Sequence, residues 1–169
     1  MKQRLVDIAL KEVGTLEAGG NNCGPRIREY QSASWLAAGP WPWCAALCCW
    51  ILRRWLRDTA VQEALGLSPA AVESWRCKDA SAFGWEGWAK KHGLAVLPET
   101  AKAAPGDFVI FDFSHIGIVV APQSGDYIET VEGNTNGRGD RDSESGDGVW
   151  RKRRHHSLVK CYLRMVALG

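Results

Sequence analysis

The sequence predicts an α+β fold in which helices from the N-terminal half pack on an antiparallel sheet from the C-terminal half. Apolar residues recur at helical spacing up to Gly93, whereas short apolar runs bounded by turn residues follow Pro98. Because the helices come first and the strands second, the class is α+β and not alternating α/β. The 169 residues contain no internal repeat and no linker, so one domain over 1–169 is expected.

Six helical segments are expected in the N-terminal half. A helix over 2–13 carries its apolar residues on one face, and Gly14 ends it. After a loop over 17–24, Pro25 is well placed as the first residue of a short helix that runs to about Gln31. Further helices or helical turns are expected over residues 44–57, 60–66, 68–75 and 81–92.

The C-terminal half has the pattern of strands joined by turns. Pro105, Gly106 and Asp107 form a turn, and runs rich in β-branched and aromatic residues follow. A polar loop is expected over 136–148. The expected strands of an antiparallel sheet are 107–113, 115–121, 126–132, 149–154 and 160–168.

Charge and hydropathy exclude several classes of protein. A formal net charge of +2 is too small to indicate a nucleic-acid partner. No apolar stretch approaches the roughly 18 residues of a membrane span, so no stable membrane insertion is expected. Charges interrupt the apolar positions of residues 1–14, so the sequence predicts synthesis in the cytoplasm without a signal peptide. The adjacent Cys48 and Cys49 indicate reduced thiols and not a disulfide scaffold.

Cys44 has the features of a catalytic nucleophile. It stands in the first turn of the helix predicted over 44–57, directly after the run GPWPW at 39–43, which interrupts regular structure. A helix N-terminus lowers the pKa of a thiol, because its free N–H groups and its dipole favour the thiolate. The same N–H groups can stabilise an oxyanion in a transition state. The thiolate needs a base to hold and transfer its proton, and histidine suits that task at neutral pH.

His115 is the candidate base among four histidines. It opens the apolar strand predicted over 115–121, whereas His92 lies near the end of a helix, where solvent is expected to surround it. His155 and His156 belong to a basic run. A strand start at a sheet edge can project a fixed side chain into a cleft. Taken alone, however, a histidine before an apolar strand is more often structural than catalytic.

Glu132 and Asn134 are the candidates for orienting the imidazole through its Nδ1 atom. If strands 115–121 and 126–132 form a hairpin, their distal ends meet and bring His115 beside both candidates. Residues 132 and 134 would share one side of an extended strand. Glu132 would accept a hydrogen bond from Nδ1, and Asn134 would do the same or bind substrate. The alternative is a turn with solvated polar ends.

Two other features allow a different interpretation. Cys44 and Cys48 are one helical turn apart and Cys23 could approach them, but no C-x₂-C pair accompanies them, so no metal and no cofactor is expected. Cys48 is more simply a small apolar residue in a packed helix. The basic run at 151–156 suits an anionic polymer, but the preferred interpretation is a solvated edge strand or loop that the acidic run at 139–148 neutralises.

Four motifs, in this order, resemble the CHAP family, the cysteine, histidine-dependent amidohydrolases/peptidases. The resemblance covers roughly residues 14–166, and a cysteine on a helix followed by a histidine and a polar residue on consecutive strands is also the plan of papain-like enzymes. The motifs are Gly39-Pro-Trp-Pro-Trp-Cys44-Ala-Ala, Pro105-Gly-Asp-Phe-Val-Ile-Phe, His115-Ile-Gly-Ile-Val and Val131-Glu-Gly-Asn134-Thr-Asn.

This resemblance implies a papain-like α+β fold and a single CHAP-like catalytic domain over 1–169. It implies cleavage of amide bonds in bacterial peptidoglycan, by an N-acetylmuramoyl-L-alanine amidase or by an endopeptidase. On the matching positions it assigns Cys44 as nucleophile, His115 as base, and Glu132 with Asn134 as orienting and site residues.

The sequence departs from the family pattern in two places. Many relatives carry a more aromatic or β-branched run where this chain has Leu47, Cys48 and Cys49. Some bind calcium through an acidic loop before the cysteine, but residues 17–24 hold one carboxylate, so calcium is not expected.

The family resemblance also suggests a biological setting. CHAP proteins include phage endolysins, tail-associated lysins, and bacterial wall amidases or toxins. The sequence is interpreted as that of a monomeric endolysin whose partner is peptidoglycan, which it reaches after release by a holin or a secretion apparatus. The alternatives are a secreted antibacterial amidase effector and a catalytically inactive wall-binding module.

Overall fold

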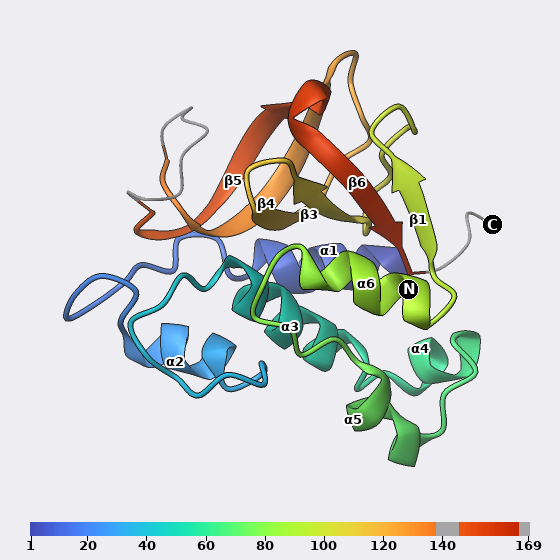
Figure 1. Cartoon of the computed structure of the whole chain (residues 1–169), viewed down its shortest axis with the longest axis horizontal. Helices are drawn as coiled ribbons and strands as arrows, with labels where there is room; N and C mark the ends of the chain where they lie inside the picture. Colours follow the sequence, from blue (N-terminus) through green and yellow to red (C-terminus); the bar gives the residue numbers. More distant parts are fainter. Residues whose placement is uncertain (138–145, 166–169) are drawn as a thin grey trace.

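The computed structural model describes residues 1–137 and 146–165, and it has helices from the N-terminal half packed against a six-stranded antiparallel sheet (Figure 1). The predicted α+β class is confirmed. None of the helices in the described part of the chain is long and apolar enough to span a bilayer.

The helices follow the predicted segments closely. The first helix ends at Leu10, three residues earlier than expected, because the chain then turns and the Gly14 amide donates to the Val149 carbonyl at 2.9 Å. The α-helices are α1 (Lys2–Leu10), α2 (Pro25–Gln31), α3 (Cys44–Trp55), α4 (Thr59–Ala64), α5 (Val72–Trp75) and α6 (Gly84–Lys91), with 3₁₀ turns at Pro69–Ala71 and His156–Leu158.

The five strands that the sequence predicted are present, and one further strand precedes them in the chain. The order in the sheet is β1-β6-β2-β3-β4-β5, and every neighbouring pair is antiparallel. β1 was missed because it is only four residues long and shows no alternation of buried and exposed positions. The strands are β1 (Ala95–Pro98), β2 (Phe108–Phe111), β3 (His115–Val119), β4 (Tyr127–Thr135), β5 (Gly148–His155) and β6 (Val159–Arg164).

Parts of two sequence predictions lie outside the described residues. The polar loop predicted over 136–148 and the acidic run over 139–148 both include 138–145, which are not described. The last predicted strand, over 160–168, is described only to residue 165.

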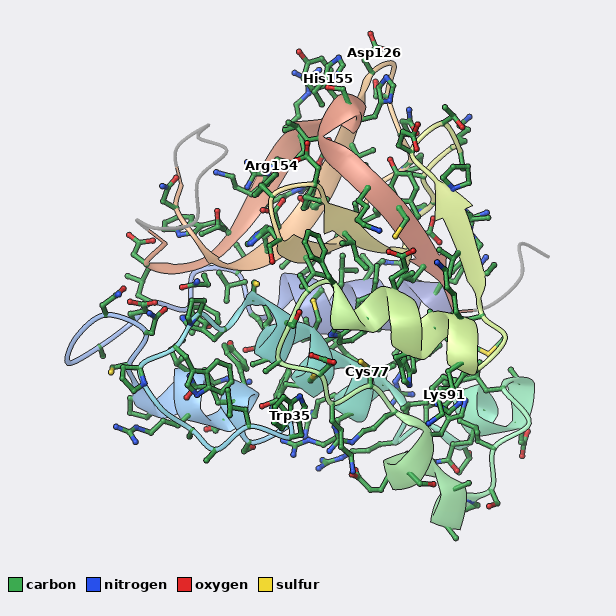
Figure 2. All side chains as sticks on the ribbon, viewed as in Figure 1. Trp35, Cys77, Lys91, Asp126, Arg154 and His155 are labelled. Atoms are coloured by element: carbon green, nitrogen blue, oxygen red, sulfur yellow. The ribbon has the colours of Figure 1, made fainter. Side chains whose placement is uncertain are left out.

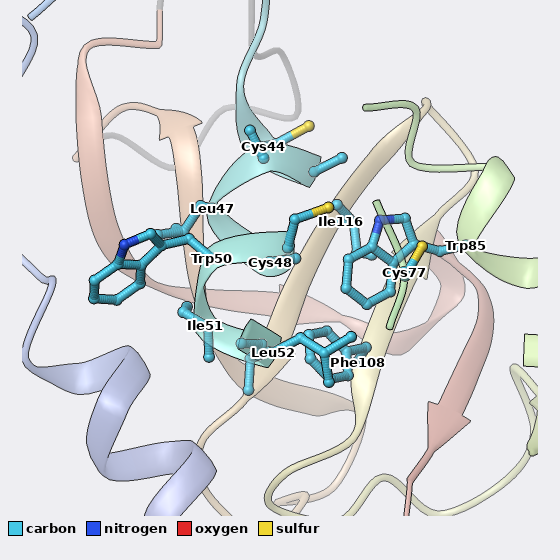
Figure 3. Packing of buried hydrophobic residues seen from close by; sticks show 14 of the residues in the cluster. Cys44, Leu47, Cys48, Trp50, Ile51, Leu52, Cys77, Trp85, Phe108 and Ile116 are labelled. Atoms are coloured by element: carbon cyan, nitrogen blue, oxygen red, sulfur yellow. The ribbon is translucent and has the colours of Figure 1, made fainter. Parts of the chain in front are cut away.

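Helix α3 contacts α1 and α2 as well as strands β3 and β4, while α1 and α6 also lie against the sheet (Figure 1). Ten of its twelve residues are buried, as expected for a helix that is apolar on nearly every side. Its two remaining residues, Arg53 and Arg54, lie in the last turn, where cations suit the helix dipole. Figure 3 shows Ile116 and Phe108 packed against this helix from the sheet.

The opposite face of the sheet buries a second, smaller cluster, so the central strands are covered on both sides. β2 and β3 are buried at every position for this reason. His115, Gly117 and Val119 alternate onto the face of the second cluster, while Ile116 and Ile118 face α3. The second cluster consists of Ala103, Val109, Phe111, Val119, Ile128, Val159 and Tyr162.

A β-bulge in β4 brings the start of α3 close to the sheet. Glu132 pairs with Trp150 and Thr135 with Gly148, so two residues of β4 lie opposite a single residue of β5. Asn134 adopts a left-handed conformation with φ of 53°. At Gly133 a Cβ atom would lie 2.7 Å from the Trp43 ring, so only glycine permits this approach. The condition under which residues 132 and 134 would share one side, an extended strand, is therefore not met at the bulge.

Replacement of Gly133 with alanine is expected to destabilise the fold. The added Cβ would lie 2.7 Å from Trp43 and 2.8 Å from Leu47, and the resulting shift should lower the free energy of unfolding by about 1–3 kcal/mol. Urea denaturation measures this loss. Gly87→Ala is the matched control, because this exposed position on α6 has no atom within 4 Å of a new Cβ. Equal unfolding free energies for the two variants would contradict the close packing of α3 on the bulge.

Candidate active site

Cys44 is the first residue of α3, and the segment that precedes it is held by two side chains. Gln31 donates from Nε2 to the Gly39 carbonyl at 2.7 Å and accepts from the Gly39 amide at 3.2 Å. Glu17 accepts a 2.8 Å hydrogen bond from the Trp43 indole. Among residues 1–137 and 146–165 no side chain caps the start of α3, so its first amides are available to an anion at position 44.

His115 opens β3, and aromatic rings fix its plane. It follows Ser114, whose left-handed backbone (φ of 59°) turns the chain into the strand. The imidazole stacks on Phe113 at 5.7 Å between ring centroids with an angle of 10°, and on Phe111 at 6.0 Å. The side chain is fully buried, so it has one orientation toward its neighbours.

Glu132 belongs to β4, the strand next to β3, and its side chain contacts the imidazole. Its Oε2 atom is 2.9 Å from His115 Nε2, and both side chains are completely buried. Glu132 pairs in register with Gly117, and a Cβ at Gly117 would lie 2.7 Å from the Glu132 Cγ atom. The absence of a side chain at residue 117 therefore lets the carboxylate reach the histidine.

The other imidazole nitrogen is left for Cys44. Within the described residues no nitrogen, oxygen or sulfur atom lies in hydrogen-bond geometry with the buried Nδ1 atom. The Cys44 thiol is close enough for its charge and hydrogen bonding to affect the imidazole. Because Nε2 is engaged by Glu132, Nδ1 is the atom available to share a proton with the sulfur.

The two groups favour a thiolate–imidazolium ion pair. Burial acts to raise the pKa of the Cys44 thiol, but the charge and hydrogen bond of His115, with the amides of Ile116 and Ala45, lower it below its ordinary value. Burial acts to lower the pKa of His115, but the Cys44 thiolate and the Glu132 carboxylate raise it to about 9. The sulfur is therefore ionised at a lower pH than an ordinary thiol.

Arg154 completes the site from β5. Its Nε atom donates to Glu132 Oε1 at 3.0 Å, and a terminal nitrogen donates to Oε2 at 2.6 Å. Thr130 donates to Oε1 at 2.6 Å. Burial acts to raise the pKa of Glu132, but the hydrogen bonds from His115 and Arg154 lower it to about 2. The carboxylate therefore stays ionised behind the histidine.

The structure brings three of the four predicted site residues into one line. Cys44, His115 and Glu132 adjoin one another, but Glu132 engages Nε2 and not the expected Nδ1. Asn134 is buried, with 3% of its surface exposed, yet it makes no hydrogen bond to the imidazole. The left-handed backbone at the bulge explains this difference.

Arg154 is the site residue that the sequence interpretation missed. The run at 151–156 was expected to be solvated, and it is an edge strand whose Arg151 and Arg153 are exposed. Lys152 and Arg154 are instead buried, at 6% and 3% exposure. Figure 2 shows Arg154 beside β5, whereas His155 lies at the far tip of the sheet near Asp126. The period-two alternation of a strand was the available signal.

The remaining candidates lie outside this line of contacts. All six cysteines are free thiols, and burial raises the pKa of Cys48 and of Cys49 well above the ordinary value. His92, expected to be solvated, is half-buried with its ring against Trp75 and Trp88. Over 1–137 and 146–165, no group of three or more His, Cys, Asp or Glu side chains is arranged to hold a metal ion.

The line of contacts from Cys44 through His115 to Glu132 defines a candidate cysteine nucleophile with its base and orienting carboxylate. Comparisons of this chain with protein-family models, curated proteins and solved structures give no match. A function for this chain therefore has to be inferred from the chemistry of these side chains.

The pH dependence of Cys44 alkylation tests the ion pair. In a Cys23→Ser background, which removes the half-buried thiol, iodoacetamide is expected to react with Cys44 below pH 9, the ordinary thiol pKa. His115→Gln removes the cation and leaves burial to raise the thiol pKa, so alkylation at pH 7 should slow by about tenfold or more. Identical pH profiles for the two proteins would contradict the ion pair.

Glu132→Gln is expected to lower the free energy of unfolding by about 3–5 kcal/mol, because it removes the buried carboxylate that faces the Arg154 guanidinium and the His115 imidazole. The pKa of Glu132 falls from 4.5 to about 2 on folding, so the carboxylate's contribution is complete above pH 4.5 and is lost as pH falls through about 2. Urea denaturation across this range should show the difference from the native protein shrinking below pH 4.5.

The double variant Glu132→Gln/Arg154→Met is the control for that loss. It removes both charges, so it should recover part of the stability that the single variant loses. A single-variant loss that stays constant down to pH 2, or a double variant no more stable than the single one, would refute the charge pairing.

Proposed function

We propose that this chain is a cysteine-dependent peptidoglycan hydrolase of the CHAP type with a papain-like arrangement of helices and sheet. The observation that carries the proposal is Cys44 at the start of a buried helix, beside His115, which Glu132 backs from the neighbouring strand. These three side chains occupy the positions that the sequence motifs assign to the nucleophile, the base and the orienting residue.

The first half of the reaction forms an acyl-enzyme. The Cys44 thiolate attacks the carbonyl carbon of the scissile amide, and the oxygen becomes an oxyanion that the free amide at the start of α3 can stabilise. The carbon–nitrogen bond then breaks. The imidazolium of His115 gives its proton to the departing nitrogen, which leaves as an amine, and a thioester to Cys44 remains.

The second half releases the acyl group. Neutral His115 takes a proton from water, and the hydroxide attacks the thioester carbon. The carbon–sulfur bond breaks, the product leaves with a new carboxylate, and the thiolate–imidazolium pair is restored. Glu132 stays ionised throughout, because its pKa is about 2, and so it holds the ring and stabilises the imidazolium.

The proposed setting is that of a monomeric phage endolysin made in the cytoplasm and released to the wall by a holin or a secretion apparatus. The intact set of nucleophile, base, carboxylate and arginine supports an active enzyme over an inactive wall-binding module. A binding module has no need of a buried ion pair at position 44.

Cys44→Ala is expected to abolish lysis of purified peptidoglycan and to leave wall binding intact. Loss of a catalytic nucleophile lowers turnover by about 10⁴-fold or more. The loss of turbidity of a wall suspension measures lysis, and co-sedimentation measures binding. Cys48→Ala is the matched control, since it removes a buried thiol one turn along α3 that takes no part in the reaction. Undiminished lysis by the Cys44 variant would refute the proposal.

Mass spectrometry of the digested muropeptides then identifies the bond. A free muramoyl lactyl group indicates an N-acetylmuramoyl-L-alanine amidase, whereas new peptide termini indicate an endopeptidase. Digestion by the native protein that yields neither product would exclude amide hydrolysis.

A further inference from the structure

A hollow of about 380 Å³ lies between helix α1 and the C-terminal end of α3, and we call it the α1–α3 hollow. Its lining consists of Arg4, Asp7, Ile8, Lys11, Arg54 and Arg57. Sites for small ligands have volumes of this order, but their walls are mostly apolar. Among the described residues that line this hollow, Ile8 alone is apolar, so the hollow suits a charged ligand.

The two walls of the hollow come from helices that contact each other and run in opposite directions (Figure 1). At one end, the Trp55 indole donates to the Met1 carbonyl at 3.0 Å, so the start of α1 lies beside the end of α3. Just past the other end of α1, Glu12 accepts a 2.7 Å hydrogen bond from Arg26. The guanidinium of Arg26 also lies 4.5 Å from the centre of the Trp50 ring on α3.

Cations occur on both walls of the hollow. Arg4 and Lys11 are two helical turns apart on the α1 side, and Arg54 and Arg57 are three residues apart on the α3 side. Side chains at these spacings lie along the same face of a helix. Arg4 has a counter-ion, because it forms an ion pair with Asp58. The positive charge of the other three cations is left for a ligand.

Lys11, Arg54 and Arg57 are exposed, and none of them forms an ion pair with a residue in 1–137 or 146–165. Asp7, the carboxylate in the lining, instead accepts a hydrogen bond from a neighbouring glutamine on α1. Burial lowers the pKa of Arg53, and the charges of Arg57 and Arg54 are among the neighbours that lower it further. The hollow therefore has an excess of positive charge.

A compact group with several negative charges is the chemical complement of this lining. A single carboxylate neutralises one cation, whereas a di- or triphosphate group offers several charged oxygens that can contact both walls at once. Arginine binds phosphate oxygens through paired N–H donors, and each bound charge also relieves the repulsion between the cations. No aromatic side chain belongs to the described lining, so recognition is confined to the phosphates and does not extend to a nucleobase.

We propose that the α1–α3 hollow binds a di- or triphosphate group of a soluble molecule through Lys11, Arg54 and Arg57. The bound group bridges α1 and α3 and stabilises their packing. From residue 44 to residue 54 a helix rises about 15 Å, so this site lies at the opposite end of α3 from Cys44. It is separate from the candidate active site and does not depend on the proposed function.

Calorimetric titration with inorganic tripolyphosphate at low ionic strength tests this site. The native protein is expected to bind one tripolyphosphate, more tightly than it binds orthophosphate, and added salt should weaken the binding. The double variant Lys11→Gln/Arg57→Gln should bind about tenfold or more weakly, because two charged donors are lost. Failure of the native protein to bind tripolyphosphate would overturn the proposal.

Arg28→Gln/Lys91→Gln is the matched control, because it removes the same charge from two exposed residues that do not line the hollow. It should bind tripolyphosphate as the native protein does. Equal weakening in the two double variants would overturn the proposal, since net charge alone would then set the affinity.

Co-sedimentation with vesicles of phosphatidylglycerol in phosphatidylcholine distinguishes a lipid surface from a soluble phosphate. The native protein and both double variants should sediment equally little. Sedimentation that requires Lys11 and Arg57, in the absence of tripolyphosphate binding, would overturn the proposal, because the ligand would then be a membrane surface.

Thermal unfolding provides a second readout. A ligand that binds only the folded state raises Tm, so tripolyphosphate should raise the Tm of the native protein and of the control but not that of Lys11→Gln/Arg57→Gln. Without ligand, this double variant should have a Tm equal to or above the native value, because repelling charges have been removed. A lower Tm without ligand would assign the two cations a structural role and overturn the proposal.

Discussion

The candidate site depends on a buried row of side chains whose charges alternate in sign. Arg154, Glu132, His115 and Cys44 follow one another through the interior, and each charge has an opposite charge beside it. A lone ion in such a place costs several kcal/mol or neutralises itself by changing its protonation. Because the signs alternate, a thiolate is favoured at Cys44, although only 7% of the surface of this residue is exposed.

The backbone makes room for this row at two glycines. Gly117 leaves the space that the Glu132 side chain crosses, and Gly133 lets Trp43 and Leu47 come down onto the bulge of β4. The first glycine sets the distance from carboxylate to imidazole, and the second sets the distance from helix to sheet. The geometry of the candidate site is thus defined as much by missing side chains as by reactive ones.

The order and type of the secondary-structure elements were predictable, because helical spacing and strand runs are local signals. Cys44, His115 and Glu132 were also predictable, since a helix start and a hairpin bring them together. The sequence did not predict the charges of these three side chains, the use of Nε2 or the role of Arg154. These features depend on which face of β5 turns inward and on the bulge at residues 133 and 134. The sequence analysis missed β1 because this strand is only four residues long.

The row of charges is gathered from distant parts of the chain. Cys44 lies near the start of α3, whereas Arg154 lies on the edge strand β5. The turn after α1 holds this strand, because the Gly14 amide donates to the Val149 carbonyl and the Val149 amide donates to the Thr15 carbonyl. Contacts of such long range form slowly and late in folding. A nascent polypeptide that has already produced its cysteine and its histidine therefore still lacks the arginine, so the row of charges stays incomplete until residue 154 has been added.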